Sequence, residues 1–247
     1  MTGTASVVLA CTATADDNGM RALHDVATVA GDIDYRVIGG HMVRLLRHIY
    51  NVPGPPRITS DADTGINVDV ASTGELHDRL IALGYQAECG NRYQRGAQAV
   101  DLLVPAAAKP GIQIIGERAF DAAPGLRLAL ALPPIQVSVV ARLTTSDSIE
   151  FAVPVPDVEA AFVLKTLVRT VRDTERDLQD IETLLQIVAS QPEYRASPWR
   201  MNDPSITKAG ERGDAARVAR QMISGPPTRV PAHVRALLRR HVAVPAQ

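Results

Sequence analysis

Hydrophobic and polar residues alternate along the chain in patterns that predict both helices and strands. Asp16 to Ala30 and His41 to Tyr50 carry apolar residues at intervals of three and four, which predicts two helices, the first capped by Asp17 or Asn18. A third helix is predicted from Glu75 to Leu83, ended by Gly84. Strands are predicted over residues 35–38, 57–70, 85–95, 99–104, 112–115, 127–132, 136–143 and 149–153.

The pattern changes after Pro154. Residues 157–189 have helical periodicity with Asp157 as the cap, as one long bent helix or two shorter ones. Two further amphipathic stretches follow at residues 215–223 and 232–241. We therefore expect an α+β protein in which an α/β domain, residues 1–154, precedes a helical domain, residues 155–247.

Composition adds a charge asymmetry to this picture. The 247 residues are 46% apolar and 21% charged, as in soluble globular proteins, and the formal net charge is −1. Residues 193–247 nevertheless hold ten Lys or Arg against four Asp or Glu, so an acidic body is joined to a basic end. The stretch from Arg195 to Arg240 suits a polyanion such as an RNA backbone, although it lacks interleaved aromatic residues for base stacking.

Few features indicate export or a membrane. Cys11 and Cys89 are the two cysteines, so neither a disulfide framework nor a structural zinc site is expected. Residues 6–11 faintly match a lipoprotein cleavage site, but no basic residue precedes them and the apolar run is short. We expect a cytoplasmic protein with no membrane association.

Candidate chemistry is concentrated between residues 39 and 63. Gly39-Gly40 follows a predicted strand and opens a predicted helix, which leaves backbone N–H groups free for a phosphate at the positive end of the helix dipole. Asp61 and Asp63 are two residues apart on a predicted strand, so their carboxylates project from the same face. Paired carboxylates beside a phosphate site are typical of Mg²⁺-dependent phosphoryl or nucleotidyl transfer.

A third carboxylate would complete a metal site of this kind. Asp101 is a lone acid in an apolar predicted strand, where either metal binding or acceptance of a proton from an attacking hydroxyl accounts for it. The alternative is an edge-strand Asp that faces water. Asp69 is a rival because it alternates in phase with the first two acids, but Thr64-Gly65 is expected to turn the chain between them.

These residues resemble the signature of the DNA polymerase β nucleotidyltransferase superfamily, in which Gly-Gly precedes Asp-x-Asp and a later Asp. Residues 162–181, which contain Lys165, Arg169 and Arg176-Asp177-x-x-Asp180, are similar to the helical motif of AbiEii-type nucleotidyltransferase toxins, a group that includes the mycobacterial MenT proteins. The resemblance covers residues 30–185 and implies a mixed sheet with flanking helices, followed by a helical region.

The resemblance also implies roles for single residues. Asp61 and Asp63, with Asp101, would hold Mg²⁺, and Gly39 and Gly40 would contact the triphosphate of an NTP. Lys165 would neutralise the phosphates, and Asp180 would complete the helical part of the site. Arg57, Thr59 and Ser60 lie next to the acids and are further candidates for phosphate contact, although Arg57 pairing with an acid and Thr59 as an ordinary strand residue are equally open.

Two positions leave alternatives. Lys165, Arg169 and Arg172 are spaced to share one helical face, either to bind an anionic ligand or as a solvated face paired with nearby acids. His41 stands where the family usually has Ser or Thr after Gly-Gly, so it either contacts phosphate in place of a hydroxyl or is a capping or surface residue.

The family implies transfer of a nucleoside monophosphate from an NTP to an RNA acceptor, notably the tRNA 3′ end, by a toxin that blocks translation and has a cognate antitoxin protein. A non-catalytic member that binds nucleotide or a partner, and transfer to a small molecule or protein, are the alternatives. Other enzyme classes are excluded by their missing motifs, since the chain has no Walker-type Gly-Lys-Ser/Thr, no His-x-x-x-His pair and no Gly-x-Ser-x-Gly.

Overall fold

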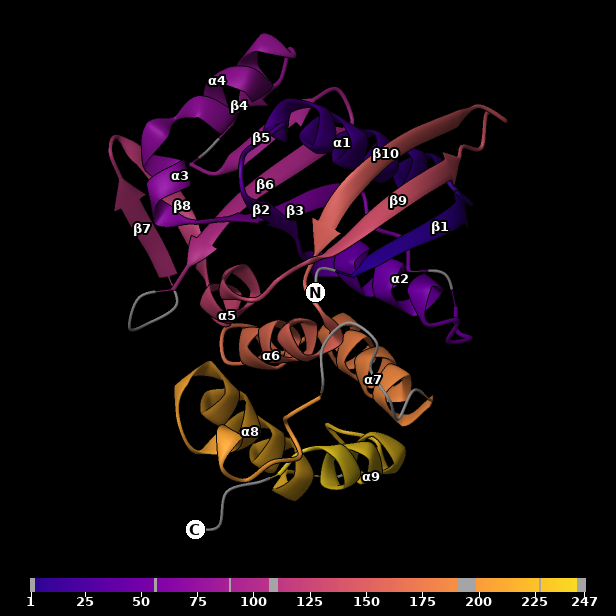
Figure 1. Ribbon diagram of the computed structural model, residues 1–247, viewed down its shortest axis with the longest axis vertical. Coiled ribbons are helices and arrows are strands. Elements are labelled where there is room, and N and C mark those ends of the chain that lie inside the picture. The colour runs from indigo at the N-terminus through magenta and orange to yellow at the C-terminus, as the bar shows by residue number, and fades with distance from the viewer. Residues whose placement is uncertain are drawn as a thin grey trace.

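A computed structural model describes residues 3–55, 57–88, 90–106, 111–190, 199–226 and 228–243 of the protein. Two sheets with helices packed around them form the first part of the chain, and a set of helices follows (Figure 1). The predicted α+β architecture is therefore confirmed. Cys89 and residues 191–198, the start of the predicted basic stretch, lie outside the described residues.

The larger sheet carries the residues of interest. Strand β3 (Asp61–Ile66) pairs antiparallel with β2 (Tyr35–Val37) and parallel with β6 (Gln98–Pro105). The β3–β6 register places Asp63 directly opposite Asp101. Beyond β6 lie β4 (Gln86–Ala87), β5 (Arg92–Arg95), β7 (Gly111–Ile115) and β8 (Arg118–Ala123), of which β5 and β8 pair with β6.

A smaller sheet of three strands lies beside the first. Strand β1 (Thr4–Ala10) pairs parallel with β9 (Ile135–Arg142), which pairs antiparallel with β10 (Ser148–Val155). The sequence pattern did not predict β1, because its partner lies more than 120 residues away in the chain. The predicted strands at residues 136–143 and 149–153 are confirmed by β9 and β10.

Helices cover the sheets and fix their positions (Figure 1). Helix α1 (Thr14–Ala30) packs on β3, β6 and β10, and α2 (Gly39–Ile49) runs from the end of β2 toward the helices that follow the sheets. Shorter helices are α3 (Val68–Thr73), α4 (Glu75–Ala82) and α5 (Leu126–Ala131). The expected side-chain cap of α1 is wrong: Ala13 is its N-cap, and Asp17 instead accepts hydrogen bonds from Thr144.

The C-terminal part is helical, as predicted. Helix α6 (Val158–Val168) begins at Asp157, whose carboxylate accepts a hydrogen bond of 2.8 Å from the Ala160 N–H. It is mostly apolar and almost fully buried, in contact with α7 (Glu175–Ser190) and α8 (Gly210–Ser224). Helix α9 (Ala232–His241) packs on α7 and α8. Among the described residues, no helix is both long and apolar enough to cross a bilayer.

Three strand predictions need correction. Residues 127–132 form helix α5, because Leu126 and Leu130 suit a helical face as well as an alternating one and their burial decides between the two. The predicted strand at 57–70 narrows to β3 and is followed by helix α3. The predicted strand at 85–95 is divided into β4 and β5, which pair antiparallel with each other.

Candidate active site

Three carboxylates meet on neighbouring strands of the larger sheet. Asp61 and Asp63 project from β3 and Asp101 from β6, and one carboxylate oxygen of each lies within 4.8 Å of the others. Thr59 supports this group, since its Oγ1 donates a hydrogen bond of 2.9 Å to Asp61 Oδ1. Because β6 lies between β3 and β5, Asp101 is on an inner strand and not at an edge. We call Asp61, Asp63 and Asp101 the carboxylate wall.

Electrostatic repulsion is strong within the carboxylate wall. Burial and the negative charge of Asp61 raise the pKa of Asp63 to about 7, with Asp101 adding to the effect and Lys165 opposing it. Burial also raises the pKa of Asp101, whose Oδ2 lies 2.8 Å from Nη1 of Arg92. A divalent cation with oxygen ligands would relieve this repulsion, so the donor set and its spacing fit Mg²⁺.

The Gly39-Gly40 turn brings the start of α2 against Asp63. Gly39 has φ +66°, and a Cβ at this position would lie 1.8 Å from Asp63 Oδ2, so a side chain here is excluded on both grounds. No side chain of the described residues caps the N-terminus of α2. Its free N–H groups therefore face the same region as the carboxylate wall, as an anion site requires.

Basic side chains face the carboxylate wall from the helical part of the chain. Lys165 Nζ lies 2.8 Å from Asp180 Oδ2, and Arg57 Nε donates a hydrogen bond of 2.9 Å to Asp180 Oδ1. Arg172 Nε lies 3.0 Å from Asp177 Oδ2. Burial acts against ionisation of Asp177, but the hydrogen bond from Arg172 and others outweigh it and lower the pKa of Asp177. We call Lys165 and Arg172, with the two acids that hold them, the basic wall.

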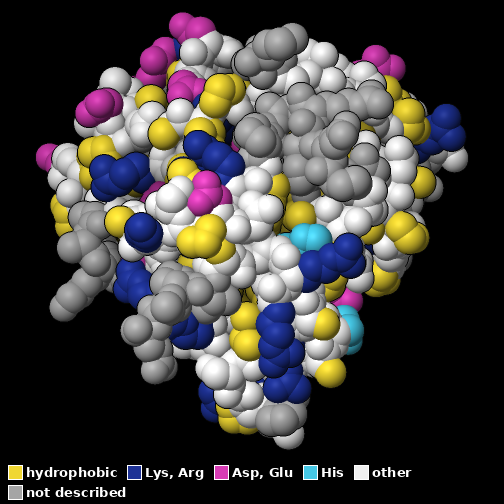
Figure 2. Space-filling view, turned by 60° about the horizontal axis from the view of Figure 1, so that its bottom comes forward, with side chains coloured by type: hydrophobic (Ala, Val, Ile, Leu, Met, Phe, Trp, Pro, Cys, Tyr) yellow, Lys and Arg dark blue, Asp and Glu magenta, His cyan; other side chains and the backbone are white. Residues whose placement is uncertain are grey.

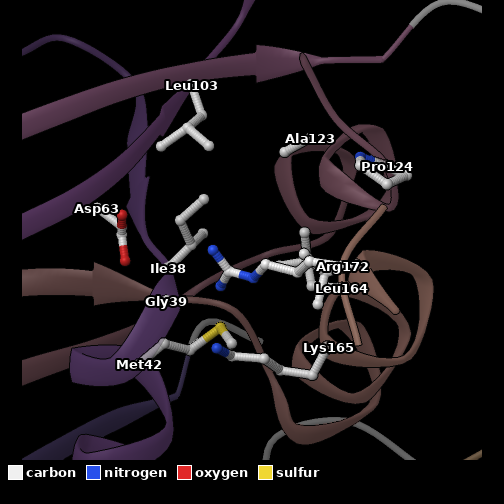
Figure 3. A pocket seen from close by; sticks show the side chains of 11 residues that line it. Ile38, Gly39, Met42, Asp63, Leu103, Ala123, Pro124, Leu164, Lys165 and Arg172 are labelled. Carbon is white, nitrogen blue, oxygen red and sulfur yellow. The ribbon is translucent and has the colours of Figure 1, made fainter. Parts of the chain in front are cut away.

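A cavity of about 540 Å³ separates the two walls, and a smaller apolar pocket of about 110 Å³ adjoins it. Asp63, Lys165 and Arg172 line both. Figure 3 shows the side chains of Lys165 and Arg172 extending from one side of the smaller pocket toward Asp63 on the other. The large cavity is further lined by Gly40, Arg57, Thr59, Asp61, Asn91, Arg92, Asp101, Leu103, Asp121, Thr174, Arg176 and Asp177.

Most candidate residues from the sequence are thus brought together. Gly39 lines the smaller pocket, and Asp180 lies behind the cavity, where it holds Lys165 and Arg57. Ser60 is exposed and does not line the large cavity. Asp69, the rival third carboxylate, lies at the start of α3, outside the carboxylate cluster of the described residues.

His41 turns away from the cavity. The residue is 1% exposed, and its Nε2 lies 3.0 Å from where a Cβ on Gly19 would stand, so it packs against α1. Neither ring nitrogen has a hydrogen-bond partner among the described residues. Burial, together with the positive charge of Arg44, lowers the pKa of His41 to about 3, so the ring is neutral. His41 is therefore neither a surface residue nor placed to contact a phosphate in the cavity, so both of these predictions are wrong.

Arg169 also lies outside the cavity, so the shared face expected for Lys165, Arg169 and Arg172 is wrong. Helix α6 ends at Val168, and the chain then turns, so helical spacing does not apply to Arg172. Arg169 pairs with Asp173 on the opposite side of this turn. Of the two alternatives left open for residues 157–189, two shorter helices, α6 and α7, are therefore found, and the break between them falls within the spacing that was read as one helical face.

Several lining residues were absent from the predicted site. Asn91, Arg92 and Asp121 reach the cavity only through the pairing of β5 and β8 with β6, which local sequence does not reveal. Asp177 did carry a signal, since it precedes Asp180 by one helical turn and begins the Asp-x-x-Asp part of the motif.

No protein-family model matches the sequence, and no curated protein matches it either. Solved structures, among them the following two, are similar to this chain. The antibiotic-resistance factor ANT(2″)-Ia has 16% identity and a TM-score of 0.41, over 71% of this chain and 85% of that chain. An antigenic nucleotidyltransferase-like protein from Paracoccidioides brasiliensis has 16% identity and a TM-score of 0.48, over 94% of this chain and 96% of that chain.

Proposed function

We propose that the protein is a Mg²⁺-dependent nucleotidyltransferase that moves a nucleoside monophosphate from an NTP to an acceptor hydroxyl and releases pyrophosphate. The observation that carries this proposal is the pair of opposed walls: three clustered carboxylates face Lys165 and Arg172 across one cavity. Such a cavity can hold a cation on one side and the phosphates of a nucleotide on the other.

The carboxylate wall is the metal site in this proposal. Asp61, Asp63 and Asp101 would hold Mg²⁺, which when bound supplies stabilisation of negative charge that develops on the transferred phosphoryl group. Asp101 lines the cavity beside the other two acids and has a second task as a proton acceptor. It takes the proton of the acceptor hydroxyl while that oxygen bonds to the α-phosphorus.

The triphosphate lies between the turn at Gly39-Gly40 and the basic wall. The free N–H groups at the start of α2 donate to phosphate oxygens, and the close approach that Gly39 permits keeps them near Asp63. Lys165 and Arg172 neutralise the phosphates and favour departure of pyrophosphate, in which the bond from the α-phosphorus to the bridging oxygen breaks. Asp180 positions Lys165 and does not touch the substrate.

The position of His41 removes the observation that favoured a non-catalytic member. The hypothesis of a non-catalytic protein depended on an imidazole that replaces the phosphate-binding hydroxyl after Gly-Gly. A buried, neutral His41 that packs against α1 leaves the phosphate site to backbone N–H groups and to Arg57 and Thr59, which line the cavity.

The acceptor in this proposal is an RNA, with the tRNA 3′ end as first choice, and the cellular role is that of a toxin with a cognate antitoxin. Two features support it: the similarity of residues 162–181 to the helical motif of AbiEii-type toxins, and the excess of arginine near the C-terminus. Nucleotide transfer to a tRNA 3′ end would prevent aminoacylation and stop translation.

The test is incubation of the protein with Mg²⁺, total tRNA and each of the four labelled NTPs in turn. We expect label on RNA with at least one NTP, lost on chelation and lost in Asp61→Asn. Asp69→Asn is the matched control, since this acid lies on α3 away from the cluster, and it should leave transfer unchanged. Absence of transfer with all four NTPs, to tRNA and to total cellular RNA alike, would contradict an RNA nucleotidyltransferase.

A further inference from the structure

A second cavity lies in the helical part of the chain. It has a volume of about 250 Å³ and lies between the turn after α6 and the end of α8 with the segment toward α9. None of its lining residues lines either cavity beside the carboxylate wall. The lining residues are Arg169, Asp173, Val218, Gln221, Met222, Gly225, Pro226, Arg229 and Val230.

Arg169 is the buried polar group of this cavity. Its side chain is 8% exposed, and its Nη2 pairs with the half-exposed carboxylate of Asp173. Nη1 is buried and has no hydrogen-bond partner among the described residues. A guanidinium N–H without an acceptor is costly to bury, so the site is chemically incomplete as the chain alone builds it.

Arg229 adds a second positive charge. It is exposed at the cavity and forms no ion pair with any described residue. From residue 215 to the C-terminus the sequence contains six arginines and no Asp or Glu, and the one acid among the described residues that line this cavity is Asp173, which pairs with Arg169. Figure 2 turns the α8–α9 end of the molecule toward the viewer. In the lower half of this view, Lys and Arg side chains are frequent and acidic side chains are sparse.

The remaining walls are apolar. Val218 and Met222 contribute from α8, and Pro226 and Val230 from the segment that follows, with the Gln221 amide as the further hydrogen-bonding group. A bare inorganic ion would leave these walls without a partner, whereas a sugar or base ring would pack on them.

We propose that this cavity binds the phosphate group of an organic phosphate, with Arg169 and Arg229 on the phosphate oxygens and the apolar walls on its organic part. Arginine forks donate two parallel hydrogen bonds to phosphate, and several phosphate oxygens are available to bridge two guanidinium groups. The ligand is either a small phosphorylated molecule or a nucleotide within an RNA strand, and both present the same chemistry. The proposal does not rest on nucleotidyl transfer, because it uses no residue of that site.

The site is connected to the first cavity through one short segment. Residues 169–174 offer Arg169 and Asp173 to the second cavity and Arg172 and Thr174 to the first. We therefore expect a ligand bound to Arg169 to affect the position of Arg172, because both residues belong to the same turn.

The experiment is calorimetric titration of the full chain with AMP, with inorganic phosphate and with a five-nucleotide single-stranded RNA, all in EDTA so that the carboxylate wall holds no metal. Arg172→Gln serves as the background, because Arg172 lines both pockets beside the carboxylate wall and its side chain is largely exposed, so its loss weakens binding there without unfolding the chain. In that background we expect AMP to bind, and Arg229→Gln to weaken it about tenfold through loss of a charged hydrogen-bonding partner. Arg239→Gln, on the exposed side of α9, is the matched control and should have no effect on AMP.

Binding of the RNA at least tenfold tighter than AMP, with the same dependence on Arg229, would identify nucleic acid as the source of the phosphate. AMP binding equal to that of the RNA would identify a small molecule. The proposal is overturned if no probe binds in the Arg172→Gln background, or if Arg229→Gln and Arg239→Gln weaken binding equally. Because Arg229 is exposed, its substitution tests the site even if Arg169→Gln fails to fold.

Discussion

The two walls of the first cavity are built on opposite electrostatic principles. On the basic wall, Lys165 and Arg172 each contact a carboxylate of the same chain, Asp180 at 2.8 Å and Asp177 at 3.0 Å. On the carboxylate wall, Asp61, Asp63 and Asp101 lie close together, and the pKa of Asp63 rises to about 7 through burial and repulsion. The charges of the basic wall are neutralised within the chain, whereas those of the carboxylate wall are not.

This difference separates stability from function. A wall of satisfied ion pairs contributes to the folded state and is ordered before any ligand arrives. A wall of partly buried like charges lowers stability and is retained only where it serves a function. Substitutions on the two walls should therefore change stability in opposite directions, even where both reduce activity.

The largest effect is expected from Asp63→Asn. Removal of this carboxylate takes away a proposed metal ligand, and several kcal/mol of lost transition-state stabilisation correspond to a fall in transfer rate of about 10³-fold. Initial rates with saturating NTP and RNA measure it. Asp69→Asn, which removes the same charge from α3, should keep the wild-type rate, and a comparable loss in both variants would assign the effect to net charge.

On the basic wall, Asp180→Asn should reduce stability most. Asp180 is 1% exposed and is shared by Lys165 and Arg57, so its loss removes the carboxylate that Arg57 pairs with and leaves Lys165 only its longer contact of 3.7 Å with Asp177. Breaking a buried pair costs about 3–5 kcal/mol, which lowers Tm by about 10 °C in a chain of this size. Thermal denaturation measures it, with Asp173→Asn as the exposed comparison. An unchanged Tm would show that the ion pairs of the basic wall do not stabilise the folded protein.

The pH dependence of stability should identify Asp63 directly. Its folded-state pKa is raised from 3.8 to about 7, so it binds its proton more tightly in the folded state. The stabilisation this gives is fully present below pH 4 and is lost as the pH rises to about 7. In EDTA, the Tm of Asp63→Asn minus that of the wild type should therefore grow by about 10 °C between pH 4 and 7. A difference that stays flat or shrinks would contradict the raised pKa.

Arg172→Gln should have the smallest effect on stability. Its side chain is 60% exposed, and its buried partner Asp177 keeps its contacts with Lys165 and Thr174 when Arg172 is replaced, so Tm should change by less than about 3 °C. Since Arg172 lines both pockets beside Asp63, KM for the NTP should rise about tenfold while kcat changes less. Steady-state kinetics over a range of NTP concentrations separates KM from kcat. An effect on kcat alone would show that Arg172 does not contribute to binding of the NTP before the reaction.

The sequence predicted those parts of the fold and site that depend on local patterns. The order of Gly39-Gly40, a helix and then Asp61 and Asp63 on one strand is visible in the chain itself, and so is the cap at Asp157. The orientation of Arg169 was not predictable, because the helix end at Val168 depends on how the next turn packs. Arg92 and Asp121 reach the cavity only through pairing between strands distant in sequence, which no local pattern encodes.

The position of His41 illustrates the same limit. The sequence showed that an imidazole follows Gly-Gly, but whether it points at the phosphate site or into the core depends on Gly19, whose missing side chain leaves room for it. That contact joins residues 22 positions apart and depends on how α1 packs.

Direct measurement of Mn²⁺ binding, as a spectroscopic probe for Mg²⁺, tests the central claim most sharply. Electron paramagnetic resonance of free Mn²⁺ would be followed as wild type, Asp63→Asn and Asp69→Asn are added at pH 8. We predict that wild type and Asp69→Asn bind Mn²⁺ with the same affinity, and that Asp63→Asn binds at least tenfold more weakly. Equal Mn²⁺ affinity in all three proteins would show that the carboxylate wall is not a metal site and would contradict the account.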